Sequence, residues 1–495
     1  MSRYRLLPSL AGAVGLLVAP AAYAQATPEQ AKALEQQIRS WLSGMLGPTV
    51  DVSALAMKFT PDGANYRVEI PLDGPVGTTG VTIAATPLTA LAKPLDGGRW
   101  AIDELRYPSP VKISFPQPKA GAPATPNALP VSMTIEMTDQ DHHIILDPTL
   151  ATTSTFDGKL GSYTSTTQTP AGVQTTRIER LSGRGVLQPQ AGGQQLMTSE
   201  SVGERFTSRM PMPDGSEMVV SGDRLRVTMK GDRVDLAQYG RIIRTALTLA
   251  GSAKDAKPGA DMTPADKDMA HALVVALANL FGSMEGEESI DGLQVKFGAF
   301  GGKISRLVMG GSAAAPNGVA EMRMHYSVEG LDSPMIPPGV YREFLPRKVT
   351  MDPRIGGVPK EDLVAVLQYL IDHGSKDDNT ELQAKGMELM AKGPLVVGLD
   401  NVLIDLGLAS LTAEGEVTIP SPAEISADAE IRVTGLDALI KRISSTPELK
   451  MAMPVLTFLK GLGKADGKQT VWKIAYEDNK LTVNGNDMSS MIPGR

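Results

Sequence analysis

Apolar and polar residues alternate with a period of two over most of this chain, which is typical of β-strands with two different faces. In residues 131–138, for example, Val, Met or Ile occupies every odd position and Ser, Thr or Glu every even one. The pattern predicts strands within 50–115, a long antiparallel meander over 131–229 and more strands over 293–484. Asp157-Gly158 and Asp214-Gly215 are predicted as hairpin turns, because Asp-Gly tolerates the left-handed backbone of tight turns.

A helical period of three to four residues interrupts the strands at several places. Thr27-Pro28-Glu29-Gln30 predicts a capped helix start, and the helix continues to about Leu46. Its predicted apolar face consists of Ile38, Trp41, Leu42, Met45 and Leu46. Further helices are predicted over 236–247, 263–281, 359–374 and 446–454.

One arrangement recurs: a strand, a turn with Gly and Asp, and then an amphipathic helix. Residues 429–443 show it most clearly, around Gly435-Leu436-Asp437, and looser versions occupy 225–247 and 324–332. Helices that follow runs of strands, without strict alternation, indicate the α+β class. We expect long, curved antiparallel β-sheets with amphipathic helices packed on them, arranged as two similar halves.

The expected organisation begins with a cleaved signal peptide over 1–24. Arg3 and Arg5 precede an apolar run, and Ala22-Tyr23-Ala24 is typical of a cleavage site. The apolar run is shorter than the ~20 residues that a membrane span needs, and no later stretch reaches that length. We expect an N-terminal half over 25–250, a helical connector over 251–283 and a C-terminal half over 284–495, in a bacterial protein exported to the periplasm.

The composition narrows the function classes. The chain has 495 residues, a formal net charge of −7 and no Cys, which excludes disulfides, thiol catalysis and thiolate metal sites. The negative charge argues against a nucleic-acid partner and weakly against anionic membrane surfaces as partners. Aromatic residues make up 4% of the chain, whereas Met is plentiful with 24 residues.

The search for catalytic and metal-binding motifs is negative. The chain has no nucleophile elbow, Walker loop, dinucleotide-binding fingerprint or zinc-protease motif. Of the five His residues only His142 and His143 are adjacent, and neighbours on a strand point to opposite faces. We therefore interpret them as polar strand positions, and the acidic stretch 284–288 as a solvated turn. We predict no catalytic residue, no metal ligand, no cofactor and no enzymatic activity.

Methionines recur on the predicted strands and leave two interpretations open. They pack in an ordinary core, or they line a groove in which flexible, polarisable side chains adapt to ligands of varied shape. The positions are Met133, Met137, Met210, Met212, Met218, Met229, Met309, Met322 and Met324.

Several stretches resemble the YdgA-like and AsmA-like envelope proteins of proteobacteria, a class with a domain of unknown function. The resembling stretches are 86–88, 96–105, 406–417, 433–440, 472–476 and 482–485. The resemblance implies a periplasmic protein of long curved sheets, and relatives in the wider group are thought to move or organise lipids. AsmA-type proteins have an anchor instead of a cleavable signal, which weighs against a bridging role between membranes.

Three hypotheses follow. The first is a periplasmic protein that binds or carries a lipid or other amphipathic ligand in an apolar β-groove, whose residues the sequence leaves unknown. The alternative is a structural or adaptor protein of the cell envelope that acts through an envelope protein partner. The third is a hydrolase whose site is scattered along the chain.

Overall fold

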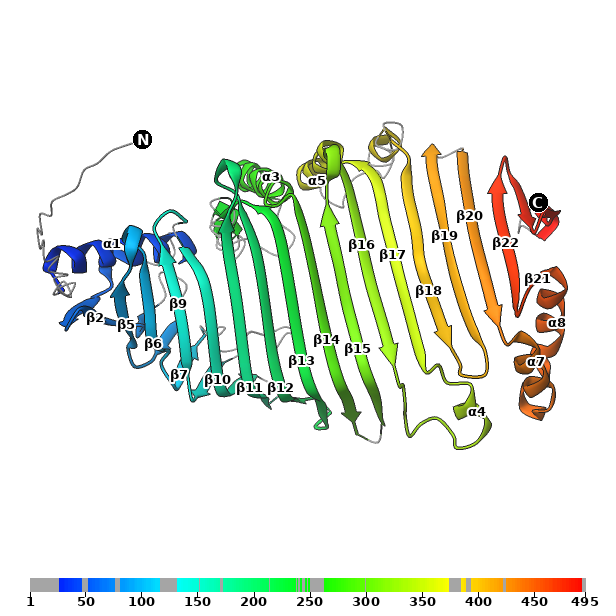
Figure 1. Ribbon diagram of the computed structural model, residues 1–495, viewed down its shortest axis with the longest axis horizontal. Helices are drawn as coiled ribbons and strands as arrows, with labels where there is room; N and C mark the ends of the chain where they lie inside the picture. Colours follow the sequence, from blue (N-terminus) through cyan, green and yellow to red (C-terminus); the bar gives the residue numbers. More distant parts are fainter. Residues whose placement is uncertain are drawn as a thin grey trace, which may run out of the picture.

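The computed structural model of the protein is an elongated, curved antiparallel β-sheet with helices along it (Figure 1). It describes residues 26–46, 52–75, 81–115, 131–150, 152–169, 172–212, 214–236, 238, 241–242, 245–246, 248–249, 262–298, 300–373, 384–388, 393–421 and 424–491. Described strands near the two ends of the chain lie at opposite ends of the long axis (Figure 1). The signal peptide predicted over 1–24 lies outside the described residues.

The strands of the described residues belong to one sheet. Their bounds are β1 (Lys58–Asp62), β2 (Asn65–Ile70), β3 (Gly74–Pro75), β4 (Thr82–Ala84), β5 (Leu88–Pro94), β6 (Trp100–Arg106), β7 (Val111–Ser114), β8 (Ser132–Thr138), β9 (Asp141–Asp147), β10 (Thr152–Thr169), β11 (Gly172–Pro189), β12 (Gln195–Pro211), β13 (Glu217–Val234), β14 (Ser283–Phe297), β15 (Phe300–Ala314), β16 (Val319–Glu329), β17 (Lys348–Pro359), β18 (Leu395–Asp405), β19 (Ser410–Ser421), β20 (Glu424–Thr434), β21 (Lys464–Asp466), β22 (Gln469–Glu477), β23 (Lys480–Val483) and β24 (Asn486–Asp487). The main helices are α1 (Pro28–Leu46), α3 (Pro264–Ala278), α4 (Val340–Glu343), α5 (Lys360–His373), α7 (Leu436–Ser444) and α8 (Met453–Leu462).

From β9 to β20 each strand pairs with the next one along the chain, apart from a branch at β10. The first part of β10 pairs with β9, which continues through β6, β5 and β2 to β1. The second part of β10 pairs with β8, which continues through β7 and β4 to β3. Beyond β20 the sheet ends with β22, β21, β23 and β24.

The two halves expected from the sequence share one continuous sheet. Strands β13 and β14 lie on either side of the chain segment that was predicted as a connector, and they pair directly from Met218↔Phe297 to Asp232↔Ser283. The predicted α+β class with a long curved antiparallel sheet and attached helices is therefore confirmed.

A row of left-handed backbone positions bends the long strands. Arg180 in β11 has φ of 49°, Arg205 in β12 has φ of 48° and Gly292 in β14 has φ of 65°. The ladder between β11 and β12 is irregular at this point. A left-handed residue inside a strand behaves as a β-bulge and redirects the chain, so the row contributes to the curvature of the sheet.

The register carries one apolar face along the whole sheet, because residues paired across antiparallel strands lie on the same face. Phe156 of β10 pairs with Ile144 of β9, and a chain of such pairs leads to Ala92 and Tyr66 at the N-terminal end. The same face continues to Met324 of β16 in the other direction. From β16 the pairs lead to the C-terminal strands through Met322, Ile355, Val397, Val417, Ala427 and Tyr476.

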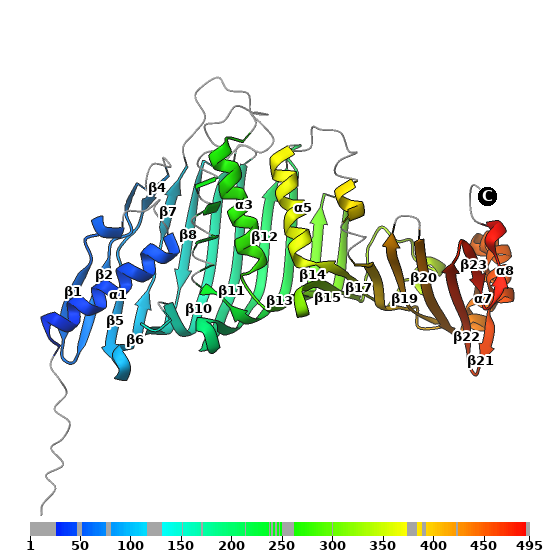
Figure 2. The ribbon, with the colours of Figure 1, turned by 90° about the horizontal axis from the view of Figure 1, so that it is seen from above.

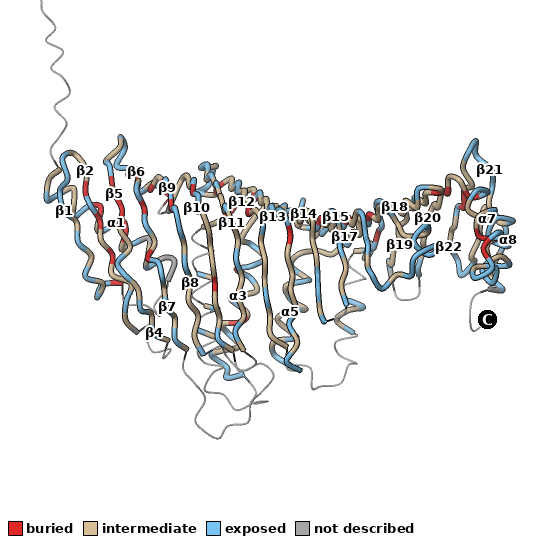
Figure 3. Tube along the Cα trace, turned by 90° about the horizontal axis from the view of Figure 1, so that it is seen from below, coloured by how far each residue is buried: buried red, intermediate tan, exposed pale blue. Residues whose placement is uncertain are grey.

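Each end of this face is covered by helices that form a small core. Helix α1 places Leu34 and Ile38 on Tyr66, Val68 and their neighbours at the N-terminal end. Its start is capped as predicted, since Gln30 N donates to Thr27 Oγ1 at 3.2 Å. At the C-terminal end α7 and α8 pack on Val433 and Trp472. Buried residues gather near these two ends (Figure 3), and α1, α3 and α5 lie on one side of the sheet (Figure 2).

Several local predictions were wrong. Asp157-Gly158, predicted as a turn, lies inside β10, where cross-strand pairing on both sides overrides the local turn preference. The acidic stretch 284–288, predicted as a solvated turn, lies inside β14 between β13 and β15. The turn at Asp214-Gly215 is confirmed, with Asp214 Oδ1 accepting from Ser216 N at 3.0 Å. In the helix predicted over 236–247, Tyr239, Ile243 and Leu247 lie outside the described residues.

Candidate functional site

The middle of the apolar face is uncovered. Seven large apolar side chains on β15 to β18 share this face and are 37–44% exposed: Met309, Met322, Tyr326, Met351, Ile355, Val397 and Leu399. The register makes them neighbours, because Met309 pairs with Tyr326 and Tyr326 with Met351. Monomeric soluble proteins rarely expose a contiguous apolar stripe without a binding role. We call these seven residues the apolar stripe.

The stripe bears on the two interpretations of the strand methionines at Met309 and Met322, whereas the other seven predicted positions are half-buried. Met309, Met322 and Met351 are exposed on the sheet, whereas a core position would be covered by a second layer. Next to the stripe, small residues such as Gly286 and Gly311 pair on the same face. Met309, Met322 and Met351 therefore line an open surface beside small residues on the same face.

Two helices, α3 and α5, lie on one side of the sheet and keep large apolar side chains exposed (Figure 2). Helix α5 follows β17 directly, and none of its residues is buried. Its Leu363, Leu367 and Leu370, spaced as one helix face, are 37–41% exposed.

Helix α5 is held by its neighbour α3 through polar contacts. Lys360 Nζ donates to Asn279 Oδ1 at 2.9 Å, and His271 Nε2 lies 3.2 Å from Gln368 O and 3.0 Å from Asp372 Oδ1. Contacts at both ends of the pair fix the helices to each other in antiparallel order. Their exposed leucines, which include Leu277 of α3, add to the apolar surface of the molecule.

At its C-terminal end the apolar face leads into a cavity of about 440 Å³. Strands β18 to β23 form one wall, and α7 and α8 form the other. The lining side chains are Ile404, Leu406, Ala409, Ser410, Leu411, Ile431, Val433, Leu436, Leu439, Leu456, Leu459, Leu462, Trp472, Ile474 and Val483. The indole Nε1 of Trp472 donates to Leu459 O at 2.8 Å, so this polar group is satisfied within the wall. The cavity suits a ligand part that carries no polar atoms.

The sequence builds this cavity from the repeated strand–turn–helix arrangement. Gly435 has φ of 78°, and this left-handed conformation turns the chain from β20 into α7. A side chain there would collide with Leu408 O and Ala409, so glycine is required for the close approach. The turn brings Leu436 and Leu439 over Val433, which places the helix on the apolar face.

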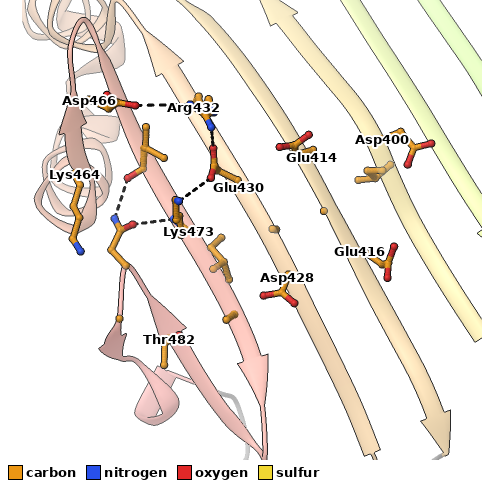
Figure 4. Close-up of a pocket in the computed structure, with 18 of the residues that line it drawn as sticks. Asp400, Glu414, Glu416, Asp428, Glu430, Arg432, Lys464, Asp466, Lys473 and Thr482 are labelled. Atoms are coloured by element: carbon orange, nitrogen blue, oxygen red, sulfur yellow. Dashed lines mark hydrogen bonds and ion pairs between the residues drawn. The ribbon is translucent and has the colours of Figure 1, made fainter. Parts of the chain in front are cut away.

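The opposite face of the same strands carries charge (Figure 4). It forms an open hollow of about 860 Å³ with acidic and basic side chains from β17 to β22. Arg354 donates to Asp400 at 3.0 Å and to Glu416 at 2.7 Å, and the bond to Glu416 lowers the pKa of that carboxyl. Glu430 lies between Arg432 and Lys473.

The charged hollow supplies no convergent chemistry. Its charged side chains follow the strands, and Arg354, Arg432 and Lys473 form ion pairs with acidic residues among them. Within the described part of the chain no group of three or more His, Cys, Asp or Glu could hold a metal ion.

The two adjacent histidines point to opposite faces, but they are not both polar surface positions. His143 Nδ1 pairs with Asp103 on the solvated side. His142 is only 6% exposed and packs between Tyr107 and Phe156 at the edge of the N-terminal core. Burial lowers the pKa of His142, so the ring is held neutral. Both histidines are thus strand residues on opposite faces of β9, and His142 is the one on the buried face.

Comparisons with protein-family models, with curated proteins and with solved structures gave no match for this chain. The resemblance to YdgA-like and AsmA-like proteins therefore stays a prediction. Among the described helices, none is both long and apolar enough to cross a membrane.

The sequence analysis predicted neither the cavity nor the apolar stripe. A signal for the cavity was present in the leucines of α7 and α8, which recur at helical spacing in residues 436–462. The stripe had no such local signal, because its members are up to 90 residues apart and meet only through strand pairing.

Proposed function

We propose that this protein binds the acyl chains of lipids or similar amphipathic molecules on its apolar face. The observation that carries the proposal is the exposed apolar stripe on a face that also leads into the cavity beside α7 and α8. When hydrocarbon covers an apolar surface that was in contact with water, the free energy of the system decreases.

The physical chemistry of the face suits hydrocarbon chains. Each methylene that leaves water contributes about 0.8 kcal/mol, and Met side chains adjust to chains of different shape at low cost. Among the described lining residues of the cavity, Ser410 is the one with a hydroxyl side chain. The end of an acyl chain would occupy the cavity, and a polar headgroup would stay outside it.

We further propose that the protein acts in the periplasm. The support is the predicted signal peptide with Arg3, Arg5 and the site Ala22-Tyr23-Ala24. A chain without Cys folds independently of the redox state of that compartment. The adaptor hypothesis shares this location, and the experiment below distinguishes the two.

The test is native mass spectrometry of the mature protein purified from the periplasm, followed by organic extraction. Discrete adducts that extract as lipids are expected for the wild type. The variant Met322→Asp/Met351→Asp should lose most of this lipid, because a carboxylate on the stripe opposes hydrocarbon contact. Ser312→Asp on the opposite face is the matched control, since Ser312 pairs with Arg323 across the ladder.

The results decide between the hypotheses as follows. Lipid adducts in the wild type and in Ser312→Asp, with loss in the double variant, support the acyl-chain proposal. A wild-type protein without adducts that copurifies with a stoichiometric protein partner contradicts it and favours the adaptor hypothesis.

A further inference from the structure

The helical tip at the C-terminal end of the molecule, residues 436–464, exposes apolar side chains on its outer surface. Met451 is 93% exposed, Val455 60% and Phe458 48%. Val455 and Phe458 are three residues apart in α8 and so lie on one helix face. They are the most exposed large apolar residues at this end of the sheet, and packing within α8 does not explain why they are apolar.

Helix α8 is apolar on its inner surface as well. Leu456, Leu459 and Leu462 line the cavity, whereas Met451, Val455 and Phe458 do not. One short helix therefore separates the apolar cavity from an apolar outer surface. A helix that served only as a lid would be expected to present polar residues to water.

The charge of the tip is opposite in sign to that of the chain. Residues 436–464 contain five basic side chains and two acidic ones, a formal net charge of +3, whereas the whole chain carries −7. The basic residues are Lys441, Arg442, Lys450, Lys460 and Lys464, of which Arg442 forms an ion pair with Glu343 and Lys460 with Asp437. Apolar residues flanked by Lys are the combination that binds the interface of anionic membranes.

We propose that the tip docks on an anionic lipid bilayer, with Met451, Val455 and Phe458 entering the interfacial region. Charge complementarity favours a bilayer over a second copy of the chain, because two tips face to face would bring like charges together. The position of the tip at the end of the elongated sheet leaves it accessible to a flat surface (Figure 1).

Docking also gives the cavity a route to its ligand, a consequence that rests on the proposed acyl-chain function. With α8 at the bilayer, the cavity lies directly behind the helix that contacts lipid. A lipid tail would then pass between the membrane and the apolar face without crossing the aqueous phase.

The test is co-sedimentation of the full mature protein with vesicles of phosphatidylglycerol and phosphatidylcholine, compared with phosphatidylcholine alone. We expect binding to the anionic vesicles that weakens as salt is raised. Val455→Asp/Phe458→Asp should reduce this binding at least tenfold. The control Val173→Asp/Val186→Asp changes two exposed valines of β11, 50% and 37% exposed, far from the tip in the sheet, and should bind as the wild type does.

Two results would overturn the docking proposal. One is a wild type that does not sediment with anionic vesicles, and the other is tip and control variants that bind equally. A tip-dependent dimer in light scattering, without vesicle binding, would assign the surface to a second copy instead.

A parallel assay separates this proposal from the acyl-chain proposal. Binding of a fluorescent fatty acid below its critical micelle concentration should survive in the tip variant and fall in Met322→Asp/Met351→Asp. The stripe variant should still sediment with vesicles. Tip-dependent vesicle binding without any fatty-acid binding would leave docking standing and refute the acyl-chain proposal.

Discussion

At the scale of single residues, His142 shows how a strand position acquires a property that its sequence neighbours do not share. Its ring lies 5.2 Å from that of Tyr107 and 6.1 Å from that of Phe156. Neither ring nitrogen has a hydrogen-bond partner among the described residues. Asp141 raises the pKa of His142 and Arg106 lowers it, but burial is the largest influence and lowers it.

This burial predicts a pH dependence of stability. Because the folded state holds His142 neutral, the unfolded chain binds more protons once the pH falls below about 6.5. The free energy of unfolding should therefore decrease from pH 6.5 down to the lowered folded-state pKa, by at most about 1.4 kcal/mol per pH unit. His142→Phe should flatten that part of the profile in urea unfolding, and His143→Gln should retain it. Parallel profiles for wild type and His142→Phe would contradict the assignment.

At the scale of elements, the sequence located most helices and strands because each period reports local geometry. The capped start of α1 and the Gly435 turn into α7 were also predictable, since caps and turns depend on neighbouring residues. The true length of the strands could not be predicted from the sequence. Pairing on both sides extends β10 through Asp157-Gly158 and β14 through the acidic stretch 284–288, and a local pattern carries no information about pairing.

The helix that covers the N-terminal end should matter for stability and not for ligand binding. Leu34 of α1 is fully buried on Tyr66 and Val68. Leu34→Ala leaves a cavity in that core and should lower the free energy of unfolding by about 2–5 kcal/mol. Urea denaturation of the full mature protein measures this difference. Fatty-acid binding to the folded variant should stay at the wild-type level, because the stripe lies on β15 to β18. Loss of binding in a folded Leu34→Ala protein would show that the stripe is not the site.

At the scale of the whole molecule, a single apolar face runs along the sheet, and its solvent exposure differs between its ends and its middle. Small helical cores cover its ends, and the stripe between them is exposed. The sequence could not separate these regions, because Met on a covered strand and Met on an open strand follow the same period of two. Coverage depends on where distant helices pack, so it becomes visible only in the assembled fold.

The most direct test of the account is photolabelling of the mature protein with a fatty acid that carries a diazirine in its chain, mapped by peptide mass spectrometry. The account predicts labels on the apolar stripe, at residues such as Met309, Met351 and Leu399, and in the cavity at Leu439 or Leu456. Excess unlabelled fatty acid should abolish them. Labels confined to the charged face, at Glu414 or Arg432, or no competable label at all, would contradict the claim that the apolar face binds acyl chains.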